Sequence, residues 1–269
     1  MYRPQIPSRE EIITLCEQNR PRSTGRGLAY GNDIWIKYGI GTTLAEAAMQ
    51  KFIHENSDHS LVYTPAVYDS FTATQPGQQP VTYIVMEKIE GETYVNYKEH
   101  HPDKAENMLQ AIADAARHIW SLPLPPNMSL GPMEGQVPED RFFSDYGSGR
   151  TFENVTQLEN WINEKLKFRN KPERVDFQSE RLQVCHCDLT QWNVLVDKPD
   201  KPPIIINWGY SGIYPRAFEE FALVHQFCLP GSKFAKDLHK QLFGPKLSIT
   251  MMRPLSLVAA WNTFGPYCV

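Results

Sequence analysis

The chain has 269 residues, of which 41% are hydrophobic and 22% charged, and this balance indicates a globular protein with a substantial core. The formal net charge of −4 argues against a nucleic-acid partner, because nucleic-acid binders usually carry an excess of basic residues. The sequence has no long apolar run, no apolar leader and only five scattered cysteines, so we expect no membrane contact and a cytoplasmic location.

The first third of the chain predicts a small sheet with one helix packed on it. Ser8–Glu11 and Thr43–Glu46 each place a hydroxyl three residues before a glutamate, which is the capping-box signature of a helix start. We therefore expect helices from these points to about residues 18 and 54. Runs rich in β-branched and aromatic residues predict strands at 34–38, 66–71 and 82–87.

The remaining two thirds of the chain are mainly helical in pattern. Helices are predicted at about 103–121, 156–169, 216–227, 232–242 and 248–263, the last kinked or interrupted at Pro254, with short strands at 195 and 204–206. This order predicts an α+β fold of two lobes. A small N-terminal β-sheet lobe with one helix (1–88) is joined by a hinge (89–92) to a larger, mainly helical C-terminal lobe (93–269).

The segment His186–Asn193 carries the strongest chemical signal, because it fits the pattern H-x-D-x-x-x-x-N. Phosphoryl transfer needs a carboxylate to orient and deprotonate an attacking hydroxyl, and an oxygen ligand for a magnesium ion that bridges the phosphates. Asn193 lies five positions after Asp188, so one compact loop can deliver both groups. The pattern predicts Asp188 as the catalytic base, whereas His186 is expected to brace the loop backbone.

This loop and its surroundings resemble the aminoglycoside phosphotransferase (APH) family, most closely its fungal branch. His186–Leu189 and Asn193–Asp197 are similar to the family pattern HxDLxxxNILVD, Ile205–Gly209 to IIDWE, and Ser211–Pro215 to AGxYP. The resemblance covers about residues 25–225 in the same order. It implies a protein-kinase-like fold and an ATP-dependent phosphotransferase that acts on a hydroxyl of a small molecule.

The resemblance also implies a nucleotide site in the N-terminal lobe. Ile34–Gly39 is similar to the strand that carries the phosphate-contacting lysine, which makes Lys37 that lysine and Glu46 its acidic partner. The segment Tyr83–Gly91 resembles the family's hinge. There the backbone groups of three cofactor-binding residues would meet an adenine, namely Met86, Glu87 and Ile89.

The metal site implied by the resemblance departs from the family pattern. Asn193 and Asn207 would hold magnesium, but Asn207 replaces an aspartate and Gly209 replaces the final acid of the DWE motif. Magnesium favours carboxylates, and an amide offers only one neutral oxygen. The sequence therefore leaves two hypotheses open, an ATP- and magnesium-dependent small-molecule kinase, and a degenerate or repurposed member that binds or transforms a small molecule without phosphoryl transfer.

Two further features allow more than one interpretation. The glycine-rich stretch Gly25–Gly31 predicts either a turn over the phosphates or a plain β-hairpin. Glu219 and Glu220 lie just after Tyr214-Pro215, and they could either bind a cationic group of a substrate or form a solvated helix face.

Overall fold

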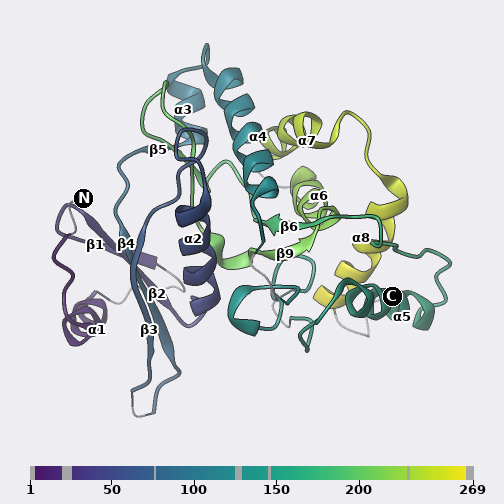
Figure 1. Ribbon diagram of the computed structural model, residues 1–269, viewed down its shortest axis with the longest axis horizontal. Helices are drawn as coiled ribbons and strands as arrows, with labels where there is room; N and C mark the ends of the chain where they lie inside the picture. The colour runs from purple at the N-terminus through teal and green to yellow at the C-terminus, as the bar shows by residue number, and fades with distance from the viewer. Residues whose placement is uncertain are drawn as a thin grey trace.

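Figure 1 shows the computed structural model, which describes residues 4–19, 26–75, 77–124, 129–144, 147–228 and 231–264. An N-terminal part is built on an antiparallel sheet, and a larger C-terminal part is mainly helical. Helix α2 (Leu44–Asn56) lies between the two parts and contacts both. The expected α+β architecture is confirmed.

The N-terminal sheet has four antiparallel strands in the order β1-β2-β4-β3. Their bounds are β1 Arg26–Tyr30, β2 Ile34–Gly39, β3 Val67–Ala73 and β4 Val81–Glu87. Alternate residues of a strand point to opposite faces, so Ile36 and Val85 pack with helix α1 (Arg9–Gln18) while Ile84 packs with α2. The same alternation places Lys37 on the α2 side of the sheet.

Both helices of the N-terminal part begin at the predicted hydroxyl residues. At α1 the capping box is complete, because Ser8 Oγ accepts from Glu11 N–H at 3.2 Å and the Glu11 carboxylate accepts from Ser8 N–H at 2.8 Å. At α2 only half of the box forms. Thr43 Oγ1 accepts from Glu46 N–H at 3.1 Å, but the Glu46 side chain turns away from the cap and into the interior.

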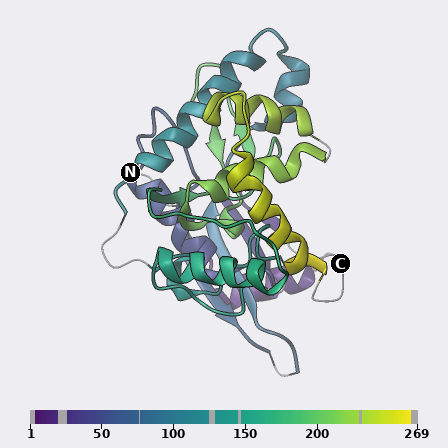
Figure 2. The same cartoon turned by 90° about the vertical axis from the view of Figure 1, so that its right-hand side faces the viewer.

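The C-terminal part contains six helices among the described residues. These are α3 Tyr94–His100, α4 Ala105–Ser121, α5 Val155–Phe168, α6 Ala217–His225, α7 Ser232–Phe243 and α8 Ile249–Phe264, with short 3-10 helices η1 Met133–Gly135, η2 Trp208–Tyr210 and η3 Gln226–Cys228. Helices α5 and α8 pack side by side on the face turned to the viewer in Figure 2.

Two small sheets in the C-terminal part hold the loops that matter most for function. Strands β5 (Glu92–Thr93), β7 (Val194–Val196) and β8 (Ile204–Ile205) form one sheet, and β6 (Leu182–Cys185) pairs with β9 (Gly212–Pro215) in the other. The loop from β6 to β7 contains the H-x-D-x-x-x-x-N segment, and the loop from β8 to β9 contains Asn207. Each loop therefore runs from one sheet to the other, and the two lie together.

Several sequence expectations are corrected in detail. The segment around Gly31 forms the β1–β2 hairpin, with Gly31 in the turn at φ 62°, so the hairpin interpretation holds; Gly25 lies outside the described residues. Helix α8 runs through Pro254 as one helix, so of the two expected effects of this proline, a kink or an interruption, the interruption is wrong. Strands β6 and β9 and helix α3 were not predicted.

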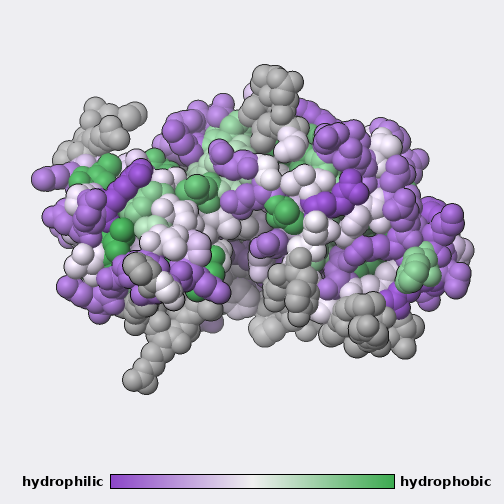
Figure 3. All heavy atoms as spheres, turned by 90° about the horizontal axis from the view of Figure 1, so that it is seen from below, coloured by the Kyte–Doolittle hydropathy of each residue, from purple (hydrophilic) through white to green (hydrophobic). Residues whose placement is uncertain are grey.

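The surface seen in Figure 3 is mostly hydrophilic. Hydrophobic side chains gather there in small patches over the N-terminal part, and polar side chains cover much of the helical part. Within the described segments, no helix is both long enough and apolar enough to span a membrane.

Candidate functional site

The loop after β6 is held in an unusual backbone conformation. Cys187 has φ 58°, a left-handed conformation that costs a residue with a side chain about 1–2 kcal/mol. The buried carboxylate of Glu219 on α6 accepts from the backbone N–H groups of His186 and Cys187, the latter at 3.4 Å, and so fixes the peptides on both sides of the turn. Burial raises the pKa of Glu219 to about 7.

His186 braces the same loop, as the sequence predicts. Its Nδ1 accepts from the Asp188 N–H at 3.2 Å, which assigns the ring proton to Nε2, and Nε2 donates to the Ile206 carbonyl at 3.0 Å. The ring also packs on Trp208, with centroids 4.7 Å apart. Burial lowers the pKa of His186, so a neutral imidazole ties the two loops together.

Asp188 stands at the centre of the site and both of its carboxylate oxygens have partners. Asn193 Nδ2 donates to Asp188 Oδ2 at 2.9 Å and to the Asp188 carbonyl at 2.7 Å. Arg141 donates to Oδ1 from Nε at 2.8 Å and also from Nη2. The expected base is therefore oriented by one residue of its own loop and by an arginine that sequence motifs do not mark.

On the other side of Asn193 a chain of polar contacts leads into the N-terminal part. Asn207 Nδ2 donates to Asn193 Oδ1 at 3.2 Å, and Lys37 Nζ donates to Asn207 Oδ1 at 2.8 Å. Lys37 also donates to Glu46, whose side chain is only 1% exposed. Asn207 has φ 68°, a conformation that asparagine tolerates better than most residues. The structure thus brings Lys37, Glu46, Asn193, Asn207 and Asp188 into one network.

A cavity of about 410 Å³ opens beside this network, between the sheet and the C-terminal part. Its lining includes the polar side chains of the network, Lys37, Glu46, Asn193 and Asn207. It also includes Gly27, Trp35, Pro65, Met86, Ile89, Leu195 and Ile206. A mainly apolar lining together with a cation suits a base with a phosphate tail.

The three residues expected to meet the adenine, Met86, Glu87 and Ile89, all line this cavity. Met86 is a nearly buried wall residue. The Glu87 carboxylate is engaged, because it accepts from Tyr63 Oη at 2.6 Å and from Ala66 N–H at 3.2 Å. The backbone N–H of Ile89 has no acceptor among the described residues, which leaves one donor available at the cavity edge.

Comparison with known proteins identifies the family. The model of the phosphotransferase enzyme family (APH) matches residues 41–247, more than half of the chain and all the catalytic-loop residues described above. The chain belongs to this family. No curated protein sequence matches it.

Solved structures share the fold of this phosphotransferase at low sequence identity. A thermostable mutant of aminoglycoside phosphotransferase APH(4)-Ia in apo form superposes with a TM-score of 0.53 and 14% identity, covering 94% of this chain and 92% of that one. The ADP-bound aminoglycoside phosphotransferase APH(2'')-Ib gives 0.52 and 14%, covering 98% and 93%. A ternary complex of the APH(4)-Ia mutant with AMP-PNP and hygromycin B gives 0.53 and 13%, covering 93% and 94%.

The donor set of this phosphotransferase does not fit a tightly held resident magnesium ion. The side-chain oxygens of Asn193 and Asn207 are neutral, and both already accept hydrogen bonds. Across the described residues, no group of three or more His, Cys, Asp or Glu side chains is arranged to hold a metal ion. The two amides can offer neutral oxygens to a cation that arrives with a nucleotide, but they supply no charge to retain it.

Gly209 leaves space beside the buried side chain of Glu46. A Cβ at this position would lie 3.4 Å from Glu46 Oε2, which has no hydrogen-bond partner among the described residues. Alanine fits there, whereas a longer acidic side chain would place a second carboxylate near Glu46. The glycine is therefore consistent with a network in which Glu46 and Lys37 form the main ion pair.

The two acids of α6 do not form the solvated helix face that was one of the two interpretations of the sequence. Glu219 is 1% exposed and braces the catalytic loop, and Glu220 is 7% exposed and pairs with His239 at 3.1 Å. Neither forms a solvated face and neither lines the cavity beside Lys37 and Asn193, although Glu220 lines a larger cavity described below. Sequence reasoning also missed Arg141; the only available signal was an arginine within the aspartate- and phenylalanine-rich stretch 140–143.

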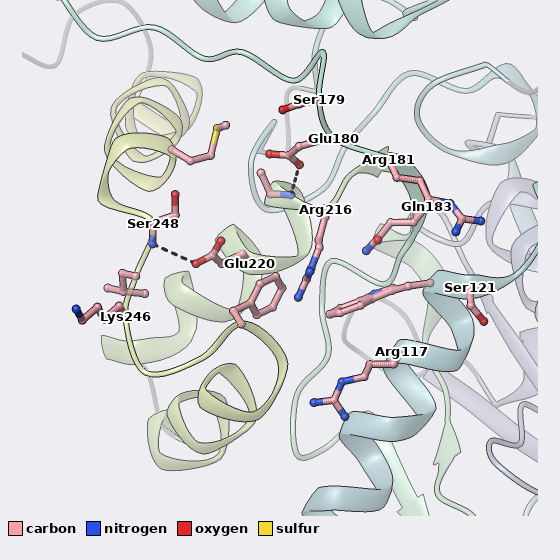
Figure 4. Close-up of a pocket in the computed structure, with 15 residues that line it drawn as sticks. Arg117, Ser121, Ser179, Glu180, Arg181, Gln183, Arg216, Glu220, Lys246 and Ser248 are labelled. Atoms are coloured by element: carbon pink, nitrogen blue, oxygen red, sulfur yellow. Dashed lines mark hydrogen bonds between the residues drawn. The ribbon is translucent and has the colours of Figure 1, made fainter.

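A larger cavity, of about 730 Å³, lies where β6 begins and β9 ends, which is the end of these strands away from the Asp188 loop (Figure 4). Arg216 lies there between the rings of Trp120 and Phe243, at 4.9 and 4.6 Å, and donates to the Leu242 carbonyl at 2.7 Å. Glu180 accepts from Ala217 N–H at 3.0 Å. These polar groups join structural elements to one another, so the smaller cavity beside Asp188 is the candidate active site.

Proposed function

We propose that this protein is an ATP-dependent phosphotransferase that acts on a hydroxyl of a small molecule. The observation that carries the proposal is the single network from Asp188 through Asn193 and Asn207 to Lys37, which borders a cavity of about 410 Å³ with a mainly apolar lining. Family membership supports the reaction type. The solved structures with ADP, AMP-PNP and aminoglycosides support a nucleotide donor and a small-molecule acceptor.

In the proposed reaction the acceptor hydroxyl approaches Asp188 while the γ-phosphate lies toward Lys37. The hydroxyl oxygen forms a new bond to the γ-phosphorus, the bond from that phosphorus to the β–γ bridging oxygen breaks, and ADP leaves. The hydroxyl proton passes to the Asp188 carboxylate and then to water. Catalysis of this kind depends mostly on positioning and on stabilising charge.

On the donor side the chain supplies one cation and two neutral amides. Lys37 would contact the phosphates, and its pairing with Glu46 fixes its direction. Magnesium is proposed to enter as part of the nucleotide substrate, with Asn193 and Asn207 as neutral contacts. The adenine is proposed to lie between Met86 and the far wall, with Ile89 N–H as its donor and Glu87 holding the hinge backbone.

Nucleotide binding can be tested by thermal unfolding with ATP and magnesium, with ATP alone and without nucleotide. A ligand at ten times its dissociation constant adds about 1.4 kcal/mol, which raises the melting temperature by roughly 2–5 °C for a chain of this size. The proposal expects this rise with ATP and magnesium. No rise at millimolar ATP would contradict it and would favour the repurposed alternative, for which the comparisons give no support.

A further inference from the structure

The loop that carries Arg141 is held in place beside Asp188 by hydrogen bonds and by two buried rings. The carboxylate of the neighbouring Asp140 accepts from the backbone N–H groups of Phe142 at 2.7 Å and Phe143 at 3.3 Å, and both rings are fully buried. Asn262 on α8 donates to the Phe142 carbonyl at 2.8 Å. The backbone that carries Arg141 is therefore fixed from both sides, and the arginine is positioned before any ligand arrives.

Among the described residues, the guanidinium of Arg141 donates hydrogen bonds from only one of its edges. Nε and Nη2 donate to Asp188 Oδ1, and the group lies over the ring of Tyr210, 5.8 Å from its centroid. No described residue accepts from Nη1. The side chain is 27% exposed, and the edge made of Nη1 and the second proton of Nη2 has no acceptor among the described residues; we call it the open edge.

Asp188 keeps one acceptor position for a substrate. Its two oxygens offer about four lone-pair sites in total. Arg141 occupies two of them on Oδ1 and Asn193 occupies one on Oδ2, which leaves one on Oδ2. A hydroxyl can bind there without displacing Arg141, so hydroxyl and arginine can act on one molecule at the same time.

We propose that the acceptor carries an anionic group, a carboxylate in its simplest form, which binds the open edge of Arg141 while a nearby hydroxyl binds Asp188. This inference rests on the proposed phosphotransferase function and specifies its substrate class as hydroxy acids. A planar carboxylate matches the paired N–H groups of a guanidinium edge, which gives strong and directional binding.

The charges around the site favour an anion over a cation. Arg141 already balances the charge of Asp188, so the pair offers little net attraction to an ammonium group. The acids that could have attracted one, Glu219 and Glu220, are buried and paired inside the protein. An ammonium group placed near Arg141 would instead meet a like charge in a partly buried site.

The proposal can be tested with acceptors that differ only in one terminal group. ADP formation from ATP would be measured with glycerate, glycerol and 3-amino-1,2-propanediol, and with the six-carbon set of gluconate, sorbitol and glucamine. We expect each carboxylate to stimulate ADP formation at least tenfold more than the matched amine, with the neutral polyol between them. Asp188-dependent hydrolysis of ATP without acceptor serves as the baseline.

Arg141→Gln and Arg141→Lys provide the residue-specific control. The Gln variant is expected to lose the carboxylate preference while it keeps nucleotide-induced thermal stabilisation, and the Lys variant to keep part of the preference. The preference is measured within each variant as the ratio of carboxylate-stimulated to amine-stimulated ADP formation, because Arg141 also orients Asp188 and its loss changes the baseline. The proposal would be overturned if carboxylate and amine stimulated ADP formation equally in the unsubstituted protein. It would also be overturned if neither stimulated ADP formation above a measurable baseline, or if Arg141→Gln left the carboxylate preference unchanged. A chain with no Asp188-dependent ADP formation under any condition would instead contradict the phosphotransferase function itself.

Discussion

The two sides of Asn193 differ in how their charged groups are arranged. On the side proposed to bind the nucleotide, a buried ion pair between Lys37 and Glu46 leads to Asn207, a neutral amide where the family pattern has an acid. On the side proposed to bind the acceptor, the acid Asp188 is present, but Arg141 neutralises it. Under the proposed function, the nucleotide side attracts phosphates mainly through Lys37, and the acceptor side selects its partner by charge. Substitutions on each side can separate the two or show that they act alike.

Asp188→Asn should cause the largest loss and only on the acceptor side. The amide cannot take the hydroxyl proton, and loss of a general base typically lowers the rate by about 10²–10⁴-fold. ADP formation would be compared with nucleotide-induced thermal stabilisation in the same variant. We expect the first to collapse and the second to remain. Equal loss of both would mean that the two sides are not separable.

Lys37→Met should affect the nucleotide side and also destabilise the fold. Glu46 is 1% exposed and would lose its charged partner, and breaking such a pair costs about 3–5 kcal/mol. Because Lys37 is itself 23% exposed, we expect the lower end of this range. The double variant Lys37→Met with Glu46→Gln should recover most of the stability in denaturant unfolding without recovering ATP binding. Recovery of ATP binding by the double variant would exclude Lys37 as the phosphate contact.

Asn207→Asp should sharpen the contrast by adding charge on the nucleotide side. A carboxylate at this position offers magnesium an anionic ligand beside Asn193, and it also gives Lys37 a second acid. We expect ADP formation to rise by about tenfold at low magnesium. A tenfold change in rate corresponds to ~1.4 kcal/mol of activation free energy. A titration with magnesium measures this effect. Unchanged activity would show that Asn207 does not contact the metal, and the matched variant Gly209→Ala should have little effect.

Glu219→Gln should act on the pH dependence of stability and not on nucleotide binding. The pKa of Glu219 is raised by burial from its ordinary 4.5 to about 7, so between these values the folded state binds a proton that the unfolded state lacks. The free energy of unfolding therefore falls as pH rises through this window, by on the order of 1–3 kcal/mol. Thermal unfolding between pH 5 and 8 should show a shallower slope in Glu219→Gln.

Asp140 provides a check on that pH dependence. Its pKa is likewise raised to about 7, mainly by burial, so Asp140→Asn should remove a further part of the same slope. A slope that neither substitution changes would mean that other groups govern the stability in this range.

The sequence predicted the fold and one side of the site for identifiable reasons. Asp188 and Asn193 lie within one loop, and the resemblance to the family pairs Lys37 with Glu46, which is only nine positions further along the chain. These are local signals. Arg141 reaches Asp188 across 47 positions, and Glu219 reaches the catalytic loop across 32 to 33 positions. Such contacts depend on how helices and loops pack, which no periodicity or motif in a single sequence encodes.

Strand β6 and its partner β9 were missed for a related reason. Each has only four residues, and the pairing of Leu182 with Pro215 joins segments 33 positions apart. The stretch Leu182–Cys185 is too short to show a strand pattern by itself. In contrast, α4 shows its apolar face over 17 residues and was predicted nearly to its ends.

The most direct test of the account is ³¹P NMR of ATP with magnesium in the presence of the purified protein and a hydroxy-acid acceptor. The account predicts that the γ-phosphate signal of ATP falls while ADP and a new phosphate ester appear, at a rate proportional to protein concentration and abolished in Asp188→Asn. If ATP stays unchanged with the hydroxy acid, with its neutral and amine counterparts and without acceptor, although it stabilises the protein against heat, the cleft binds the nucleotide without transferring its phosphate, and the phosphotransferase account is contradicted.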